Sequence, residues 1–151
     1  MFASSQITGL GPMNYQGESP GRTRILLADD NEAILAHVSA ALESDYEIVS
    51  KLTDGTAVCF EVVRLKPDLA VLDVSMGKCN GFEIGRQLRE QGYAGEIIFL
   101  TVHEDPDFVS AAFAAGGRGY VVKSRMNADL GKAVKVVLSR RIFISPPLGQ
   151  E

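Results

Sequence analysis

The chain has 151 residues, of which 46% are hydrophobic and 23% charged, as in an ordinary globular protein. This length fits one domain with a sizeable core. The net charge of −4 argues against strong binding to nucleic acid by this chain itself, because phosphate backbones favour clustered Lys and Arg. No apolar run approaches the roughly 20 residues of a membrane helix, and the N-terminus lacks the features of a signal peptide. We therefore expect a cytoplasmic protein that does not enter the membrane.

Composition divides the chain into three parts. Residues 1–22 contain four glycines, two prolines and three serines, and show no helical or strand period. We interpret them as a flexible leader. A single domain is expected over 23–140, and residues 141–151 are expected to begin a linker or C-terminal tail.

From Thr23 onward, strand-like and helix-like patterns alternate five times. Apolar runs at 25–28, 69–72 and 97–100 predict strands buried on both faces, and the more polar 47–51 predicts an edge strand. A fifth strand is predicted at 120–122. Three helices are indicated by apolar residues at helical spacing: Ile34, Leu35, Val38, Ala41 and Leu42; Val58, Val62 and Leu65; Leu130, Val134, Val137 and Leu138.

Two further helices are predicted from their end signals. Asn80 can cap a helix, and Glu83 can reach back to it. Asp105-Pro106 suits the first turn of another helix, and Gly116-Gly117 suits its end. That helix carries no charge from Phe108 to Ala115, which indicates either packing on more than one side or a surface for a partner.

The alternation of strands and helices predicts an α/β fold with a doubly wound, five-stranded parallel sheet and helices on both faces. The acids after the first strand can meet Asp73 only if strands one and three are neighbours. This condition favours the flavodoxin-like order 2-1-3-4-5, which we take from known folds of that type.

Reactive side chains follow four of the predicted strands: Asp29 and Asp30, Asp73, Thr101, and Lys123. Because the carboxyl ends of parallel strands share one edge, these groups should converge. Taken singly, the acids at 29–30 could simply cap a helix, and the Thr and Lys could be ordinary strand-end residues. Together, three carboxylates would repel one another, and Mg²⁺ would relieve that cost. Asp73 could then attack phosphorus while Lys123 and Thr101 stabilise the phosphoryl charge.

Four segments of the chain match a known pattern: Ile25–Glu32, Pro67–Met76, Leu100–Thr101 and Gly119–Ser124. With them, the chain resembles the receiver domain of two-component response regulators over about residues 23–140. The resemblance implies that Asp29, Asp30 and Asp73 hold Mg²⁺ together with the backbone carbonyl of Ser75. It implies a signalling switch rather than an enzyme, in which Asp73 accepts a phosphoryl group from a histidine kinase or phosphotransfer protein.

The same resemblance assigns the remaining roles. Lys123 would contact the phosphoryl group, and Thr101 and Tyr120 would be a switch pair that reorients on phosphorylation. Tyr120 would rotate inward, and the surface of the fourth helix, fifth strand and fifth helix would change. A second copy of the chain is a further candidate partner.

The chain departs from the receiver pattern after Asp73. The usual Met-Pro, two residues, then Asp-Gly is replaced by residues 76–81, Met-Gly-Lys-Cys-Asn-Gly. Gly77 in place of Pro should loosen the loop beside the site. His103 is expected to be a solvated loop residue near the site mouth.

The C-terminal segment Ser139–Pro146 resembles the one that joins a receiver to a helix-turn-helix output domain. A truncated receiver is therefore favoured over a stand-alone one, and DNA would be reached through an output domain outside this chain.

Three alternatives stay open. An aspartyl-phosphate phosphatase typically has a second Asp at the position of Ser75. A flavodoxin-like nucleotide-binding protein would need a phosphate-binding loop at the positions of Asp29 and Asp30. A degenerate receiver would bind partners without phosphorylation.

Overall fold

The computed structural model describes residues 21–146, so almost all of the predicted leader and the last five residues lie outside the described part. The described chain begins with a strand and alternates strands with helices. The elements are β1 (Arg24–Ala28), α1 (Glu32–Leu42), β2 (Glu47–Leu52), η1 (Gly55–Ala57), α2 (Val58–Leu65), β3 (Leu69–Asp73), β4 (Ser75–Met76), β5 (Cys79–Asn80), α3 (Gly81–Glu90), β6 (Glu96–Thr101), α4 (Pro106–Ala114), β7 (Gly119–Val122), η2 (Lys123–Arg125), α5 (Met126–Leu138) and β8 (Phe143–Ile144).

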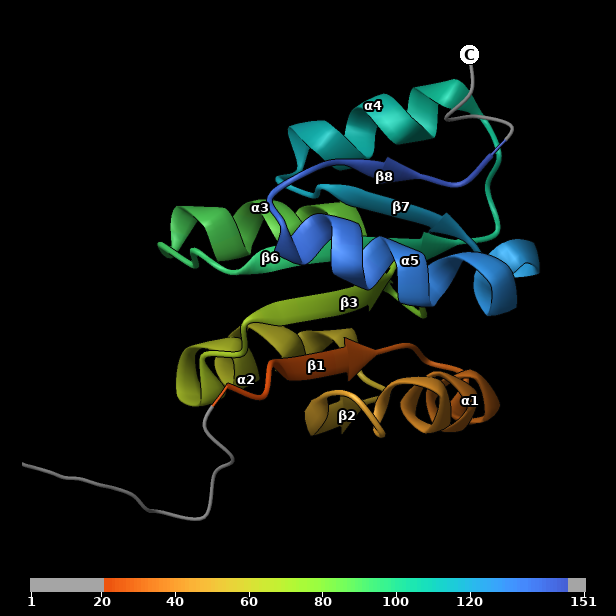
Figure 1. Cartoon of the computed structure of the whole chain (residues 1–151). Coiled ribbons are helices and arrows are strands. Elements are labelled where there is room, and N and C mark those ends of the chain that lie inside the picture. Colours follow the sequence, from red (N-terminus) through yellow and green to blue (C-terminus); the bar gives the residue numbers. More distant parts are fainter. Residues whose placement is uncertain (1–20, 147–151) are drawn as a thin grey trace, which may run out of the picture.

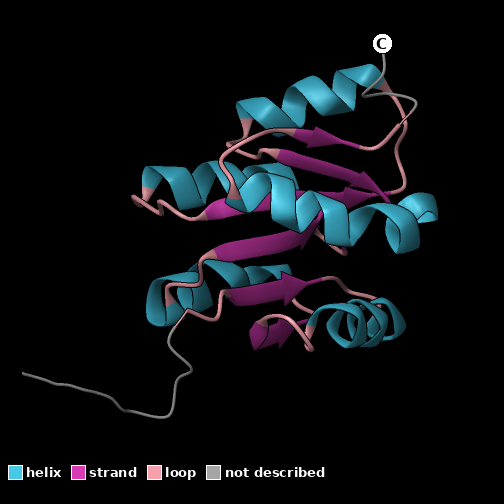
Figure 2. Ribbon diagram, in the orientation of Figure 1, coloured by secondary structure: helices cyan, strands magenta, loops and turns pink. Residues whose placement is uncertain are grey.

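Six parallel strands form the main sheet in the order β2-β1-β3-β6-β7-β8 (Figures 1 and 2). The first five correspond to the predicted strands in their predicted order, so the doubly wound fold is confirmed. The sheet is one strand larger than predicted, because β8 comes from the segment expected to begin a linker. It pairs with β7 through Gly119 opposite Phe143 and Tyr120 opposite Ile144.

Helices cover both faces of the sheet, as predicted. On one face, α2, α3 and α4 bury side chains such as Val62, Leu88 and Ala112. On the other face, α1 and α5 bury Leu35 and Val134 among their apolar stripes. The central strands β1, β3 and β6 are buried on both sides, which explains their continuous apolar sequences.

The start signals of α3 and α4 work largely as predicted. Asn80 caps α3 by accepting from Phe82 N and Glu83 N, and Asp105 caps α4 with Pro106 in its first turn. Glu83, however, does not serve as the second half of a capping box. Its carboxylate pairs at 3.1 Å with Arg86, one turn farther along the exposed side of the same helix.

Only one residue of α4, Ala112, is fully buried, although the helix carries no charge from Phe108 to its end. Phe108, Val109 and Ala111 are partly buried against the core, while Ser110 and Ala114 are exposed. Packing therefore accounts for one side of this helix. Within residues 21–146, the structure has no helix with both the length and the apolar character needed to span a membrane.

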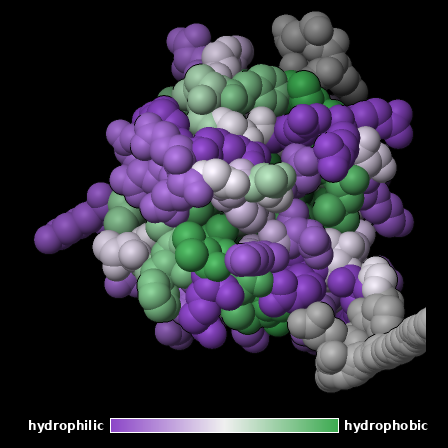
Figure 3. Space-filling model, turned by 90° about the vertical axis from the view of Figure 1, so that its left-hand side faces the viewer, coloured by the Kyte–Doolittle hydropathy of each residue, from purple (hydrophilic) through white to green (hydrophobic). Residues whose placement is uncertain are grey.

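A groove of about 570 Å³ lies at the edge where the strands begin, among the end of α2, the loop before β6 and the end of α5. Figure 3 faces this edge and shows hydrophobic side chains gathered among hydrophilic ones. Val63 lines the groove and is 57% exposed. The polar strand ends predicted from the sequence lie at the opposite edge.

We expect Phe99→Ala to lower the free energy of unfolding by about 3–5 kcal/mol. Phe99 is fully buried and packs edge-on against Phe82, with the two ring centroids 5.0 Å apart. The matched control is Phe60→Ala, which removes the same atoms from a side chain that is 69% exposed. Urea unfolding should show a change of less than about 1 kcal/mol for the control. Equal losses in the two variants would contradict the described core.

Candidate functional site

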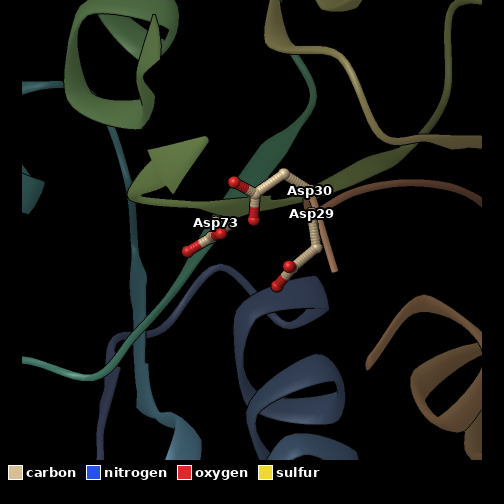
Figure 4. A group of neighbouring side chains, drawn as sticks. All are labelled: Asp29, Asp30 and Asp73. Atoms are coloured by element: carbon tan, nitrogen blue, oxygen red, sulfur yellow. The ribbon is translucent and has the colours of Figure 1, made fainter. Parts of the chain in front are cut away.

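Three carboxylates meet at the carboxyl edge of the sheet (Figure 4). Asp73 is the last residue of β3, and Asp29 and Asp30 directly follow β1. The two strands are hydrogen-bonded neighbours, with Ala28 opposite Leu72, so their ends bring these acids together. Ligand oxygens of Asp29, Asp30 and Asp73 all lie within 4.8 Å of one another. Asp29 and Asp73 are buried, whereas Asp30 is exposed.

Lys123 supplies the cation that faces this cluster. It follows β7 directly, and its Nζ lies 2.9 Å from Asp29 Oδ2 and 3.2 Å from Asp73 Oδ1. Burial opposes the ammonium charge, but the hydrogen bonds and charges of Asp29 and Asp73 outweigh it and raise the Lys123 pKa. Lys123 therefore stays protonated and neutralises part of the acidic cluster.

The environment of Asp73 works against its own charge. Burial is the largest cause, repulsion by Asp29 comes next, and together they raise the Asp73 pKa to about 6. Lys123 and the N–H of Ser75, which donates to Asp73 Oδ1 at 3.2 Å, oppose this rise. Asp73 is thus ionised near neutral pH but is held in an unfavourable place for a charge.

Each acid also accepts a backbone N–H bond that fixes its carboxylate. Asn31 N donates to Asp29 Oδ1 at 2.9 Å, and Gly77 N donates to Asp30 Oδ2 at 3.0 Å. Behind Asp73, Gly81 approaches so closely that an added Cβ would lie 2.4 Å from the Asp73 carbonyl oxygen. The loop around the site therefore depends on small residues and free N–H groups at these positions.

The unusual loop after Asp73 is a short antiparallel hairpin. In it, β4 pairs with β5 across a turn at Gly77 and Lys78. Gly77 has φ = 57°, and its N–H holds Asp30. The hairpin pairing and the bond to Asp30 give this loop specific contacts, and the expectation that Gly77 loosens it stays a prediction. The departure from Pro was itself the sequence signal, since Pro offers neither this φ nor an N–H.

The predicted switch pair lies next to the site. Thr101 ends β6, is buried, and accepts from His103 N at 3.1 Å through Oγ1. Tyr120 on β7 is fully buried, and its hydroxyl donates to the His103 carbonyl oxygen at 2.8 Å. Tyr120 thus occupies the inward position. Burial raises its pKa to about 12, so the hydroxyl stays a donor.

His103 differs from its expectation. The ring stacks on Phe108 with centroids 4.0 Å apart and an interplanar angle of 21°, and the residue is only partly exposed. The backbone carbonyl of His103 accepts from Tyr120, and its ring packs on the first turn of α4. His103 therefore connects Tyr120 to the start of α4. A lone His in a loop gave no signal for this contact, because its partner Phe108 belongs to the following helix.

The donor set fits Mg²⁺. Three carboxylates at one point provide hard oxygen ligands of the kind this cation prefers, and they repel one another without a counter-charge. Their fixation by backbone N–H groups keeps them in place. The carbonyl of Ser75 as a further ligand stays a prediction.

Comparison with known proteins agrees with this geometry. A family model described as response regulator receiver domain matches residues 25–135. The chain belongs to this family. The matched residues include the three acids, the predicted switch pair Thr101 and Tyr120, and Lys123.

Curated relatives of the receiver are transcriptional regulators. It is 31% identical over 137 residues to transcriptional regulatory protein DegU of Brevibacillus brevis, covering 89% of this chain and 57% of that protein. It is 28% identical over 128 residues to the uncharacterized transcriptional regulatory protein YvfU of Bacillus subtilis (strain 168), covering 83% and 64%. The chain therefore spans less than two thirds of each relative.

Solved structures show the same fold. A crystal structure of a two-component response regulator of the LuxR family from Aurantimonas sp. SI85-9A1 has a TM-score of 0.82 and 30% identity, covering 87% of this chain and 95% of that one. The isolated REC domain of RcsB from Salmonella enterica serovar Typhimurium, determined with phosphomimetic BeF3-, has a TM-score of 0.77 and 22% identity. It covers 86% of this receiver and 98% of its own chain.

We expect Asp73→Asn to raise the free energy of unfolding by about 1–2 kcal/mol at neutral pH without metal, because it removes a charge that the fold disfavours. The folded-state pKa lies above the unfolded one, so wild-type stability falls as pH rises from about 4 to about 6. The gain in the variant should grow over that window and then level off. Urea unfolding with a chelator measures it.

The control for this prediction is Asp45→Asn, which changes an exposed acid far from the cluster. Its stability should follow wild type within about 0.5 kcal/mol. A loss of stability in Asp73→Asn at neutral pH would contradict the account of the acidic cluster.

We expect Gly77→Pro to lower the free energy of unfolding by about 2–3 kcal/mol, because proline cannot reach φ = 57° and cannot donate to Asp30. Gly77→Asn keeps the N–H and tolerates positive φ, so its loss should stay within about 1 kcal/mol. Thermal unfolding of the two variants side by side measures the difference. A Pro variant as stable as the Asn variant would rule out this hairpin turn.

Proposed function

We propose that this receiver takes a phosphoryl group on Asp73 from the phosphohistidine of a histidine kinase or phosphotransfer protein. The observation that carries the proposal is the convergence of Asp29, Asp30 and Asp73 within 4.8 Å, with Lys123 in contact with two of them. Such a site offers a nucleophile, a place for a cation and a fixed positive charge at one point.

The carboxylate of Asp73 is suited to the attack. An oxygen of this ionised group forms the new bond to phosphorus while the bond from phosphorus to the donor nitrogen breaks and its electron pair returns to the imidazole. Burial and the Asp29 charge disfavour the carboxylate, so converting it to a mixed anhydride removes charge from its buried oxygens.

The neighbouring groups would stabilise the transferred group. Asp29, Asp30, Asp73 and the Ser75 carbonyl would hold Mg²⁺, which supplies positive charge against the phosphoryl oxygens. Lys123 would move its ammonium from Asp73 Oδ1 to a phosphoryl oxygen with little displacement, because it already lies 3.2 Å from the acceptor carboxylate. The Thr101 hydroxyl would donate to another oxygen.

The signal would leave through Thr101, Tyr120 and the α4–β7–α5 surface. Tyr120 reaches α4 through His103, whose backbone it contacts and whose ring stacks on Phe108. A shift of Thr101 toward the phosphoryl group would alter its bond to His103 N and so bias this connection. The names of the relatives support transcription control as the output. DNA would then be reached through an output domain outside this chain.

One observation favours a second candidate, a receiver that binds its partner without phosphorylation. Tyr120 lies fully inward while Lys123 remains paired with the Asp73 carboxylate. In that case the α4–β7–α5 surface would hold its binding form at all times. Partner binding by Asp73→Asn as strong as by phosphorylated wild type would favour this candidate.

We expect wild-type protein, incubated with Mg²⁺ and a small phosphodonor such as acetyl phosphate, to gain the mass of one phosphoryl group. Asp73→Asn should gain none, because the amide is not a nucleophile at this site. Intact-mass spectrometry measures both. Uptake by the variant, or none by wild type, would refute the proposal, and rapid turnover of many phosphate esters would point to a phosphatase.

A further inference from the structure

The segment after α5 is hydrogen-bonded to β7, the strand that ends at Val122 directly before Lys123. We call residues 143–145 the strap. Phe143 N donates to the Arg118 carbonyl at 3.0 Å, and Ser145 N donates to the Tyr120 carbonyl at 2.9 Å. The strap therefore extends the sheet beside β7, which carries Tyr120 and ends directly before Lys123.

The Ser145 hydroxyl joins the strap to two other elements. It accepts from Val122 N at 3.0 Å and donates to Asp129 Oδ2 at 2.7 Å. Ser145 is fully buried, and Asp129 is 1% exposed. A strap held by packing alone would place an apolar side chain at its most buried position, whereas this one places a hydroxyl with a donor and an acceptor in reach.

Asp129 closes the connection back to the η2 turn. Arg125 donates from Nε and Nη2 to both carboxylate oxygens of Asp129, at 2.9 and 3.1 Å. The bonds thus run from Val122 through Ser145 and Asp129 to Arg125. Lys123 lies in the chain between the two ends of this loop of bonds.

The bonds involved are of the strong kind. A buried hydrogen bond to a carboxylate and a bidentate Arg–carboxylate pair are shorter and stronger than neutral surface bonds. Removing one partner leaves the other buried and unsatisfied. The Val122 backbone before Lys123 and the Arg125 side chain after it are therefore held by groups that belong to the strap and to α5, not to the acidic site.

We infer that Ser145 and Asp129 are positioning residues for Lys123, and that docking of the strap is coupled to the phosphoryl group at Asp73. This inference rests on the proposed function, because it concerns the contact of Lys123 with that group. Since coupling is reciprocal, phosphorylation of Asp73 tightens the strap, and a docked strap favours phosphorylation. The strap ends next to Pro146, so the direction in which the chain leaves the receiver depends on the state of Asp73.

The first test compares Ser145→Ala with Ser139→Ala. Ser139 also follows α5, but its hydroxyl donates only to the Lys135 carbonyl at the exposed helix end. At saturating Mg²⁺ and acetyl phosphate, we expect the rate constant of phosphorylation to fall about fivefold to tenfold in Ser145→Ala, because a less well positioned Lys123 stabilises the transferred phosphoryl group less. The Ser139→Ala rate should equal that of wild type. Asp129→Asn, which breaks the loop of bonds from α5, should also slow phosphorylation.

Mg²⁺ affinity without a phosphodonor separates positioning from general loosening. The acids are anchored by the N–H groups of Asn31, Ser75 and Gly77, whereas the strap bonds to Arg118, Tyr120, Val122 and Asp129. We expect Ser145→Ala to bind Mg²⁺ at least as tightly as wild type. Two results would overturn the inference. One is a loss of Mg²⁺ affinity in Ser145→Ala equal to its loss of phosphorylation rate. The other is an unchanged phosphorylation rate in both Ser145→Ala and Asp129→Asn.

The second test is hydrogen exchange of the Ser145 amide in wild type. With Mg²⁺ and beryllofluoride, exchange should slow about fivefold or more, and in Asp73→Asn it should not change. Unchanged exchange in wild type would overturn the coupling. If wild type takes up phosphate but the strap variants react normally, this inference alone fails. If wild type takes up none, the proposed function fails and the coupling fails with it.

Discussion

The mutual repulsion of three carboxylates at one edge of the sheet is the constraint on which this receiver depends. Parallel pairing of β1 with β3 forces Asp29 and Asp73 together, and burial removes the water that would screen them. The fold tolerates this arrangement through Lys123 and through backbone N–H groups aimed at each acid. The same repulsion makes an added positive charge favourable at this edge of the sheet.

From this edge, contacts lead outward in two directions. Through Thr101 and Tyr120 they reach His103, which stacks on the first turn of α4. Through Lys123 and the backbone beside it they reach α5 and the strap. Both routes pass along β7, which presents Tyr120 and ends just before the lysine. Strand β7 therefore contacts α4 by way of His103, and α5 by way of the strap residue Ser145.

Much of the fold could be predicted because the apolar runs have distinct periods. Continuous apolar strands can be buried only in a sheet covered on both faces, and helical stripes supply the covers. The sixth strand escaped prediction, because β8 is only two residues long and neither of them is fully buried. Its pairing depends on Ser145, a polar residue whose partners lie 16 and 23 positions away in the sequence.

The acidic site was partly predictable for the same reason. Acids placed directly after strands one and three must converge once the strand order is known, and the position of Lys123 after the last predicted strand added the cation. The role of Gly77 was not predictable in detail, since a glycine in a loop ordinarily signals freedom. Here it donates a hydrogen bond to Asp30 in a conformation that proline cannot adopt.

The sequence by itself determined the alternating strands and helices and the polar groups at the strand ends, because strand and helix periodicity act locally. The strand order was taken from known folds of this type. Tertiary structure alone decided which hydrogen-bond donors hold those groups, that His103 stacks on Phe108, and that the chain returns after α5 to bind β7. These features depend on pairs of residues distant in the chain, whose distances and angles are set only when the helices pack onto the sheet.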